Sequence, residues 1–172
     1  MNTSFLKAIL ILPGTVLVYI PAFLIWMSQG TAYAATLPPV LSIRVLAAAV
    51  FGAAGMALMV WTMRLFAQKG GGGTPAPWEP IRNFIVQGPY RYMRNPMLTG
   101  VILSLVAEAV LLWSLPIGLW MVFFIIANTV YFAFVEEPGL ERRFGDAYRA
   151  YKTEVPRWLP RRTPYDAQAK PR

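Results

Sequence analysis

The chain of 172 residues contains neither cysteine nor histidine. Without cysteine there can be no disulfide, no thiolate nucleophile and no cysteine-ligated metal. Without histidine, the usual zinc sites and histidine-based acid–base catalysis are excluded as well. Any chemistry must therefore use Asp, Glu, Arg, Lys, Tyr, Asn, Ser or Thr side chains or a bound cofactor, and we expect no metal site.

Charged residues are scarce, and acidic residues are the scarcest of them. Charged residues make up 14% of the chain and hydrophobic residues 56%, whereas soluble proteins average about 25% charged residues. This composition predicts an integral membrane protein. The 16 Lys and Arg residues outnumber the 8 Asp and Glu residues, which gives a net charge of +8. Because the basic residues lie beside apolar segments, we attribute this excess to lipid headgroups and membrane topology rather than to nucleic acid.

The order of apolar and polar segments predicts an all-α integral membrane fold, with residues 1–172 forming a single membrane domain. Four apolar runs are long enough to be transmembrane helices. A polar loop separates the second run from the third, and an amphipathic interfacial helix with a basic tail follows the fourth. The predicted helices are residues 6–27, 43–66, 97–113 and 117–135, the loop is 67–96, and the interfacial helix and tail are 138–172.

The first apolar run has a second interpretation, as a signal peptide. Lys7 would be its basic region, and Ala32-Tyr33-Ala34 fits the pattern of a cleavage site. The run is longer than the apolar region of about 7–15 residues that signal peptides have. We therefore favour a retained membrane helix, bent by Pro13 and Pro21.

The positions of Lys and Arg predict the orientation in the membrane. Arg64 near the end of the second helix and four residues of the loop after it make five such residues, and the region after the fourth helix carries nine, whereas the opposite side has none before Arg44. The positive-inside rule then places both termini and the polar loop in the cytoplasm. We expect the inner membrane of a bacterium.

The segment after the fourth helix is amphipathic. Leu140, Phe144, Tyr148, Tyr151 and Val155 fall on one helical face at spacings of three and four residues. Such a helix is predicted to lie along the membrane surface, and we expect a loose tail from residue 163 onwards.

Two polar residues lie inside the apolar hairpin formed by the third and fourth helices. A lone carboxylate in lipid is costly, so Glu108 needs a partner. One interpretation is a site for a proton or another cation. The interpretation that we favour is a structural hydrogen bond from Glu108 to Asn128 or to the main chain.

Two polar clusters lie at the same end of this hairpin. Residues 90–95 precede the third helix and residues 136–143 follow the fourth, so the hairpin brings arginines and carboxylates together. One interpretation is a ring of interfacial charges that fixes the depth of the helices. The adjacent carboxylates of Glu136 and Glu137 favour a cationic ligand instead, since they gain little at an anionic membrane surface.

These clusters resemble a known family. Residues 88–100, GPYRYMRNPMLTG, are similar to the G-x-Y-R-x-x-R-H-P-x-Y-x-G stretch of isoprenylcysteine carboxyl methyltransferases and phospholipid N-methyltransferases. Residues 136–151 resemble the E-E-x-x-L-x-x-x-F-G-x-x-Y-x-x-Y segment of that superfamily, and residues 155–160 fit its V-P-x-x-x-P ending. The resemblance spans about residues 43–160. In this chain Asn95 replaces the usual His and Leu98 the usual Tyr, and an asparagine cannot serve as a general base near neutral pH.

The resemblance implies S-adenosylmethionine as cofactor and methyl donor, and a lipophilic or membrane-bound small molecule as acceptor at the cytoplasmic membrane face. It implies membrane lipids as partners and a cofactor that needs binding groups for its carboxylate, adenine, ammonium and sulfonium. Glu137, Arg143 and Tyr148 are the expected catalytic residues. The expected cofactor-binding residues are Gly88, Tyr90, Arg91, Arg94, Asn95, Pro96, Met97, Leu98, Gly100, Glu136 and Glu137.

Two other functions are compatible with the sequence. An NADPH-dependent reductase of sterols or other isoprenoids shares this C-terminal architecture, and the basic residues could bind a ribose phosphate. A small exporter of cationic compounds could use Glu108 as its coupling carboxylate.

Overall fold

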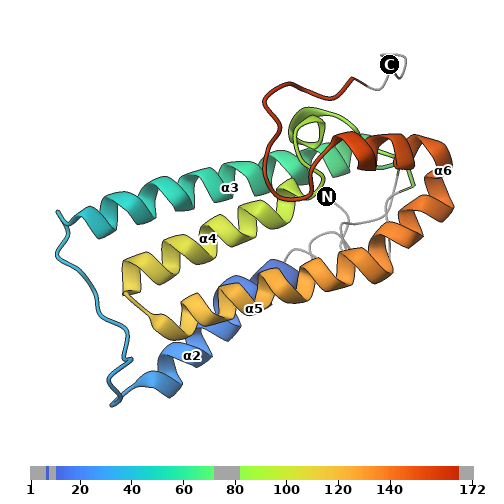
Figure 1. Cartoon of the computed structure of the whole chain (residues 1–172). Coiled ribbons are helices and arrows are strands. Elements are labelled where there is room, and N and C mark those ends of the chain that lie inside the picture. Colours follow the sequence, from blue (N-terminus) through green and yellow to red (C-terminus); the bar gives the residue numbers. More distant parts are fainter. Residues whose placement is uncertain (1–6, 8–10, 72–81, 167–172) are drawn as a thin grey trace.

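The computed structural model describes residues 7, 11–71 and 82–166, and these residues form helices and loops without any β-strand. Three helical stretches, Ile11–Ser28, Ile43–Lys69 and Leu115–Glu154, are long and apolar enough to cross a membrane. A fourth apolar helix, Pro96–Leu112, spans about 25 Å at 1.5 Å per residue. The fold class predicted from the sequence is confirmed, and the helices lie side by side in Figure 1.

The first helix is irregular, as its prolines predict. A π-helical turn η1 (Thr15–Tyr19) precedes α2 (Ile20–Ser28). The next helices match the predicted ranges closely: α3 is Ile43–Lys69 and α4 is Pro96–Leu112. A short 3₁₀ turn η2 (Gly88–Arg91) lies in the loop between them.

The end of the fourth predicted helix was placed wrongly. Helix α5 (Leu115–Tyr131) continues through a π-helical turn η3 (Phe132–Glu136) into α6 (Glu137–Glu154) without leaving helical structure. Pro138 lies in the first turn of α6, where a proline removes no needed hydrogen bond. The two residues after 135 that were expected to separate the helices are therefore helical.

The true break lies within α6, at Gly145, whose φ of 55° and ψ of −132° are not helical. Figure 1 shows α6 turning back there. The charged segment beyond Gly145 lies outside the apolar span. Its apolar face does not lie free on the membrane surface as predicted, because Tyr148, Tyr151 and Val155 pack with Tyr165 and with Phe84.

Helices α3 and α4 approach each other most closely at two glycines. A Cβ atom on Gly55 would lie 2.6 Å from the carbonyl oxygen of Gly100, and one on Gly100 would lie 2.8 Å from that of Gly55. Neither position can hold a larger residue without displacing main chain. The core then continues through Met59, Leu105 and Phe124.

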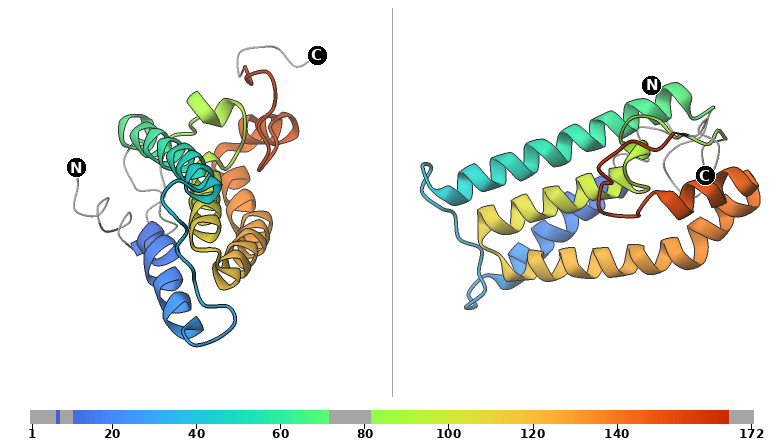
Figure 2. Two further views of the ribbon diagram at one scale, coloured as in Figure 1. Left: turned by 90° about the vertical axis from the view of Figure 1, so that its left-hand side faces the viewer. Right: turned by 45° about the horizontal axis from the view of Figure 1, so that its top comes forward.

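The segment after α6 runs back along the loop that precedes α4. The amides of Arg94 and Asn95 donate to the carbonyls of Pro156 (2.9 Å) and Arg157 (3.2 Å), and the Tyr165 amide donates to the Arg91 carbonyl (2.8 Å). Both views in Figure 2 show the two segments together. The predicted loose tail is therefore wrong for residues 163–166, because these main-chain hydrogen bonds and the buried Tyr165 ring hold them in place. Residues 167–172 lie outside the described residues.

Candidate active site

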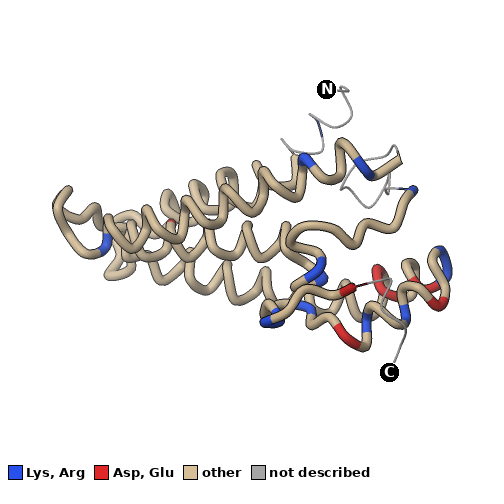
Figure 3. The backbone as a smooth tube through the Cα atoms, turned by 90° about the horizontal axis from the view of Figure 1, so that it is seen from above, with Lys and Arg blue, Asp and Glu red and all other residues tan. Residues whose placement is uncertain are grey.

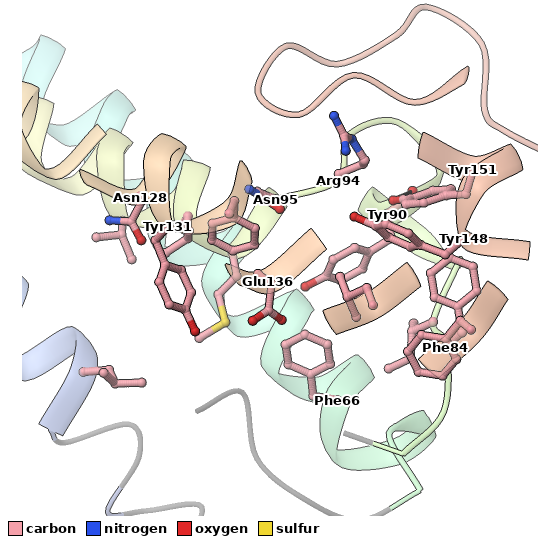
Figure 4. Close-up of a pocket in the computed structure, with 18 of the residues that line it drawn as sticks. Phe66, Phe84, Tyr90, Arg94, Asn95, Asn128, Tyr131, Glu136, Tyr148 and Tyr151 are labelled. Carbon is pink, nitrogen blue, oxygen red and sulfur yellow. Dashed lines mark hydrogen bonds between the residues drawn. The ribbon is translucent and has the colours of Figure 1, made fainter. Parts of the chain in front are cut away.

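A cavity of about 310 Å³ lies where the loop before α4 meets the joined end of α5 and α6. Its volume is in the range of small-molecule sites, and its lining is mainly apolar and aromatic with a few polar groups, as such sites usually are. In Figure 4 Glu136 lies between Tyr131 and the group of Tyr90, Tyr148 and Tyr151. The cavity is lined by Leu12, Pro13, Val16, Phe66, Asn83, Phe84, Ile85, Tyr90, Arg94, Asn95, Met97, Leu98, Val101, Phe124, Asn128, Tyr131, Phe132, Glu136, Leu140, Arg143, Phe144, Tyr148 and Tyr151.

Two hydrogen-bond donors in this lining have no partner. The Arg94 Nε and the Asn95 Nδ2 are buried and make no hydrogen bond within the described part of the chain. Asn95 is 8% exposed. Buried donors are almost always paired in folded proteins, and an unpaired one costs about 1–3 kcal/mol. These two atoms are themselves enclosed by protein, whereas Arg94 and Asn95 as residues belong to the lining of the cavity.

The carboxylate of Glu137 is buried behind these donors and is bound by three cations. Its Oε1 accepts from Arg94 Nη1 (2.6 Å) and Arg157 Nη2 (2.7 Å), and its Oε2 lies 3.1 Å from Lys152 Nζ. The side chain of Glu137 is only 4% exposed. A charge buried to this degree is tolerated only when it is paired, so this cluster fixes the position of Arg94.

Glu136 differs from its neighbour because it faces the cavity. Its carboxylate interacts with the Arg143 guanidinium and the Tyr131 hydroxyl. Successive residues of an α-helix point about 100° apart around its axis, so the two adjacent carboxylates leave the helix in different directions. One lines the cavity and the other is enclosed by arginines and lysine.

Aromatic rings form the wall on the α6 side. The Phe84 ring stacks on that of Phe144 with centroids 5.2 Å apart, and it meets the Tyr151 ring edge-on at 5.3 Å. Tyr151 donates from its hydroxyl to the carbonyl of Tyr90 (2.7 Å). Burial, and then the nearby Glu137 carboxylate, raise the pKa of Tyr148 above its usual value. Tyr148 therefore stays protonated at physiological pH and can donate a hydrogen bond into the cavity.

Most of the residues that the sequence predicted for the site line this cavity. Those brought together are Tyr90, Arg94, Asn95, Met97, Leu98, Glu136, Arg143 and Tyr148.

The remaining predicted residues support the cavity from outside it. Arg91 donates from Nε to the carbonyl of Tyr165 (2.8 Å), and Pro96 is the first residue of α4. Gly88 has a φ of +56°, with the Trp61 ring 3.2 Å from where its Cβ would be. Gly100 lies in the contact of α3 with α4, and Glu137 lies in the ion cluster.

Sequence reasoning missed the aromatic wall and the C-terminal cations. Phe66 and Phe132 look like ordinary membrane-helix residues in the sequence, and Phe84 lies in a loop. Arg157 stands at a variable position of the V-P-x-x-x-P pattern, so the motif gave it no weight. Its contact with the buried carboxylate of Glu137 becomes visible only in three dimensions.

The predicted hydrogen bond between Glu108 and Asn128 is wrong. The Asn128 amide donates instead to the carbonyl of Phe124, one turn earlier in α5, at 2.8 Å. The Oε2 of Glu108 is buried without a hydrogen-bond partner among the described residues, and Glu108 does not line the cavity. The described residues contain no group of three or more acidic side chains that could hold a metal ion.

Membrane-spanning helices that end in an aromatic cavity with a few polar groups define an integral membrane protein with a small-molecule site at one end. The sequence model of the phospholipid methyltransferase family matches residues 43–147, and the chain belongs to that family. It is therefore a membrane methyltransferase. The match confirms the resemblance found in the motifs. No curated protein and no solved structure matches the chain.

Proposed function

We propose that the protein transfers a methyl group from S-adenosylmethionine to a lipophilic or membrane-bound small molecule at the cytoplasmic membrane face. One observation carries this proposal: Arg94, Asn95 and Glu136 line a largely aromatic cavity in a member of a methyltransferase family.

The lining of the cavity fits the chemical groups of S-adenosylmethionine. Arg94 and Asn95 would donate to its carboxylate or to adenine nitrogens, since charge-assisted donors suit a carboxylate. The Glu136 carboxylate would hold its ammonium group. The rings of Phe84 and Tyr90 would contact adenine or the sulfonium, which aromatic faces attract. When bound, the cofactor supplies an electrophilic methyl group.

The surrounding side chains would contribute mainly by positioning, which is the principal requirement of an in-line displacement. Arg143 and Tyr148 would orient the polar end of the acceptor, and Tyr148 would do so as a neutral donor. Glu137 is already balanced by two arginines and a lysine. We therefore reassign it from catalytic residue and cofactor ligand to the residue that holds Arg94 in place.

The acceptor would occupy the apolar part of the cavity. Leu12 and Val16 of the first helix meet Val101 of α4 and Phe124 of α5 there. These side chains lie within membrane-spanning helices, so a lipid or another hydrophobic molecule fits this end. Membrane lipids are therefore the expected partners.

The distribution of charge supports a cytoplasmic site. Figure 3 shows Lys and Arg gathered at the end of the molecule that carries the cavity, while Arg44 lies at the start of α3, at the other end. By the positive-inside rule the cavity end faces the cytoplasm, and we assign the protein to a bacterial inner membrane.

The family match does not favour the two other functions. The matched family is one of methyltransferases, not of reductases. An exporter based on Glu108 would need that carboxylate beside a pathway, whereas it lies away from the cavity.

Calorimetric titration of the purified protein in detergent tests the proposal. S-adenosylmethionine, its demethylated product and NADPH would each be titrated into the wild-type protein and the Asn95→Ala variant. We expect the two S-adenosyl ligands to bind the wild type and to bind Asn95→Ala about tenfold or more weakly. Gln87→Ala is the matched control, because Gln87 is an exposed amide in the same loop and does not line the cavity. Binding of NADPH alone would contradict the proposal.

A further inference from the structure

Arg157 lies beyond the end of the family match at residue 147, yet it joins three parts of the site. Its Nε and Nη2 donate to Glu137 Oε1 (3.0 and 2.7 Å), and its Nη1 donates to the carbonyl of Thr129 (3.2 Å). Its own carbonyl accepts from the Asn95 amide (3.2 Å). One residue of the C-terminal segment thus contacts α5, α6 and the residue preceding α4.

The side chain of Arg157 determines how many donors of Arg94 must bind Glu137. Both guanidinium groups bind the same oxygen of Glu137, and Arg94 commits only Nη1 to it. The Nε of Arg94 is buried without a partner among the described residues, and Arg94 belongs to the lining of the cavity. Without Arg157, the buried Oε1 would lose two of its three donors and keep only the Arg94 Nη1, while Lys152 would remain at Oε2; a buried carboxylate with fewer partners is unfavourable. We expect the Arg94 guanidinium then to offer Oε1 a second nitrogen and so to change its position at the cavity.

The main chain of the same segment fixes the second unpaired donor. The carbonyls of Pro156 and Arg157 accept from the amides of Arg94 and Asn95 (2.9 and 3.2 Å). These two bonds set the direction in which the neighbouring side chains leave the main chain.

A third contact connects Arg157 to helix α5. The π-helical turn η3 begins at Phe132, whose amide is shared between the carbonyls of Asn128 and Thr129. Such turns disturb the regular hydrogen-bond pattern and often occur at functional sites. Arg157 supplies a donor to the Thr129 carbonyl, next to the cavity residue Asn128.

From this geometry we infer that Arg157 is a positioning residue of the cofactor site, which it orders through Arg94 and Asn95. The segment 155–165 is then a functional part of that site and not a tail. This inference rests on the proposed function, because the ligand that Arg94 and Asn95 would bind is S-adenosylmethionine.

The test measures the dissociation constant of S-adenosylmethionine by calorimetry for the full chain in detergent. We expect Arg157→Gln to bind about tenfold or more weakly, and Arg157→Lys to fall between it and the wild type, since lysine keeps the charge but not the forked geometry. Arg161→Gln is the matched control. Arg161 is in the same segment, and its ion pair in the described region is with partly exposed Glu154, at 3.5 Å, so its loss should leave the dissociation constant unchanged.

A double-mutant cycle with Arg94→Gln separates positioning from general structural support. If Arg157 acts through Arg94, Arg157→Gln should weaken binding much less in the Arg94→Gln background than in the wild type. An equal fold-loss in both backgrounds, or unchanged binding by Arg157→Gln, would overturn the inference. Should Arg157→Gln not fold, Arg157→Lys takes its place in the same cycle. Failure of the wild type to bind S-adenosylmethionine would instead overturn the proposed function, and the inference with it.

Discussion

Arg94 and Arg157 come from segments more than sixty residues apart and bind the same carboxylate oxygen, Oε1 of Glu137, at 2.6 and 2.7 Å. Lys152 completes the pairing at the other oxygen. The most buried charge of the described region is therefore the point at which the loop before α4, helix α6 and the C-terminal segment are joined. The loss of this buried carboxylate should therefore lower the stability of the protein.

Glu137→Gln should destabilise the protein by about 3 kcal/mol or more, because removal of one member of a buried ion pair leaves the others without compensation. The measurement is thermal unfolding in detergent, without ligand. Glu154→Gln is the control, since Glu154 forms only the half-exposed pair with Arg161, and such pairs contribute about 0–1 kcal/mol. Equal melting temperatures for Glu137→Gln and the control would contradict the assignment of Glu137 as a structural carboxylate.

Glu136→Gln should affect binding of the cofactor more than stability, the reverse of what we expect for Glu137→Gln. Glu136 faces the cavity, so its neutralisation should weaken binding of S-adenosylmethionine about tenfold or more through loss of a charge-assisted bond. The melting temperature of the ligand-free protein should change less than in Glu137→Gln. Calorimetry and thermal unfolding, both measured on Glu136→Gln and on Glu137→Gln, provide this comparison. If Glu136→Gln bound S-adenosylmethionine as tightly as the wild type does, Glu136 would not be a cofactor-binding residue.

Gly100→Ala tests the close contact of α3 with α4. The added Cβ would lie 2.8 Å from the carbonyl oxygen of Gly55, and overpacking of this kind costs about 1–3 kcal/mol. Gly118→Ala is a matched control in helix α5, because a Cβ there meets nothing within 4 Å and alanine favours a helix. Thermal unfolding should show a lower melting temperature for Gly100→Ala only.

The sequence predicted the helices well because their length and apolar composition are local properties. It also predicted which two clusters meet, since a short hairpin must bring its ends together. It could not predict the separate roles of Glu136 and Glu137, because these depend on which side chains, distant in the sequence, each carboxylate meets in the fold. The hidden break at Gly145 and the return of residues 155–166 depend on long-range packing, which no local pattern records.

Gly145→Ala tests that break directly. A φ of 55° with a ψ of −132° is accessible almost only to glycine, and forcing another residue there costs about 1–3 kcal/mol. Nothing lies within 4 Å of the added Cβ, so the cost comes from the main chain alone. Gly139→Ala, equally free of contacts but in a helical part of α6, should be neutral or stabilising. Equal melting temperatures for the two variants would show that α6 does not turn at Gly145.

The buried tyrosines predict a loss of stability at alkaline pH. Burial is the main cause that raises the pKa of Tyr90 and of Tyr151 above the usual 10. As the pH rises through about 10, the unfolded chain releases these protons while the folded chain retains them, so the unfolded state is increasingly favoured. The contribution is complete below pH 10 and is lost as the pH approaches the folded pKa values. Thermal unfolding followed across this range, together with tyrosinate absorbance, should show ionisation coinciding with unfolding. Tyr151→Phe should make the loss of stability with rising pH less steep. Tyr33→Phe, at an exposed tyrosine, should leave it unchanged. Formation of tyrosinate at a pH well below that of unfolding would contradict the buried, protonated state of these tyrosines.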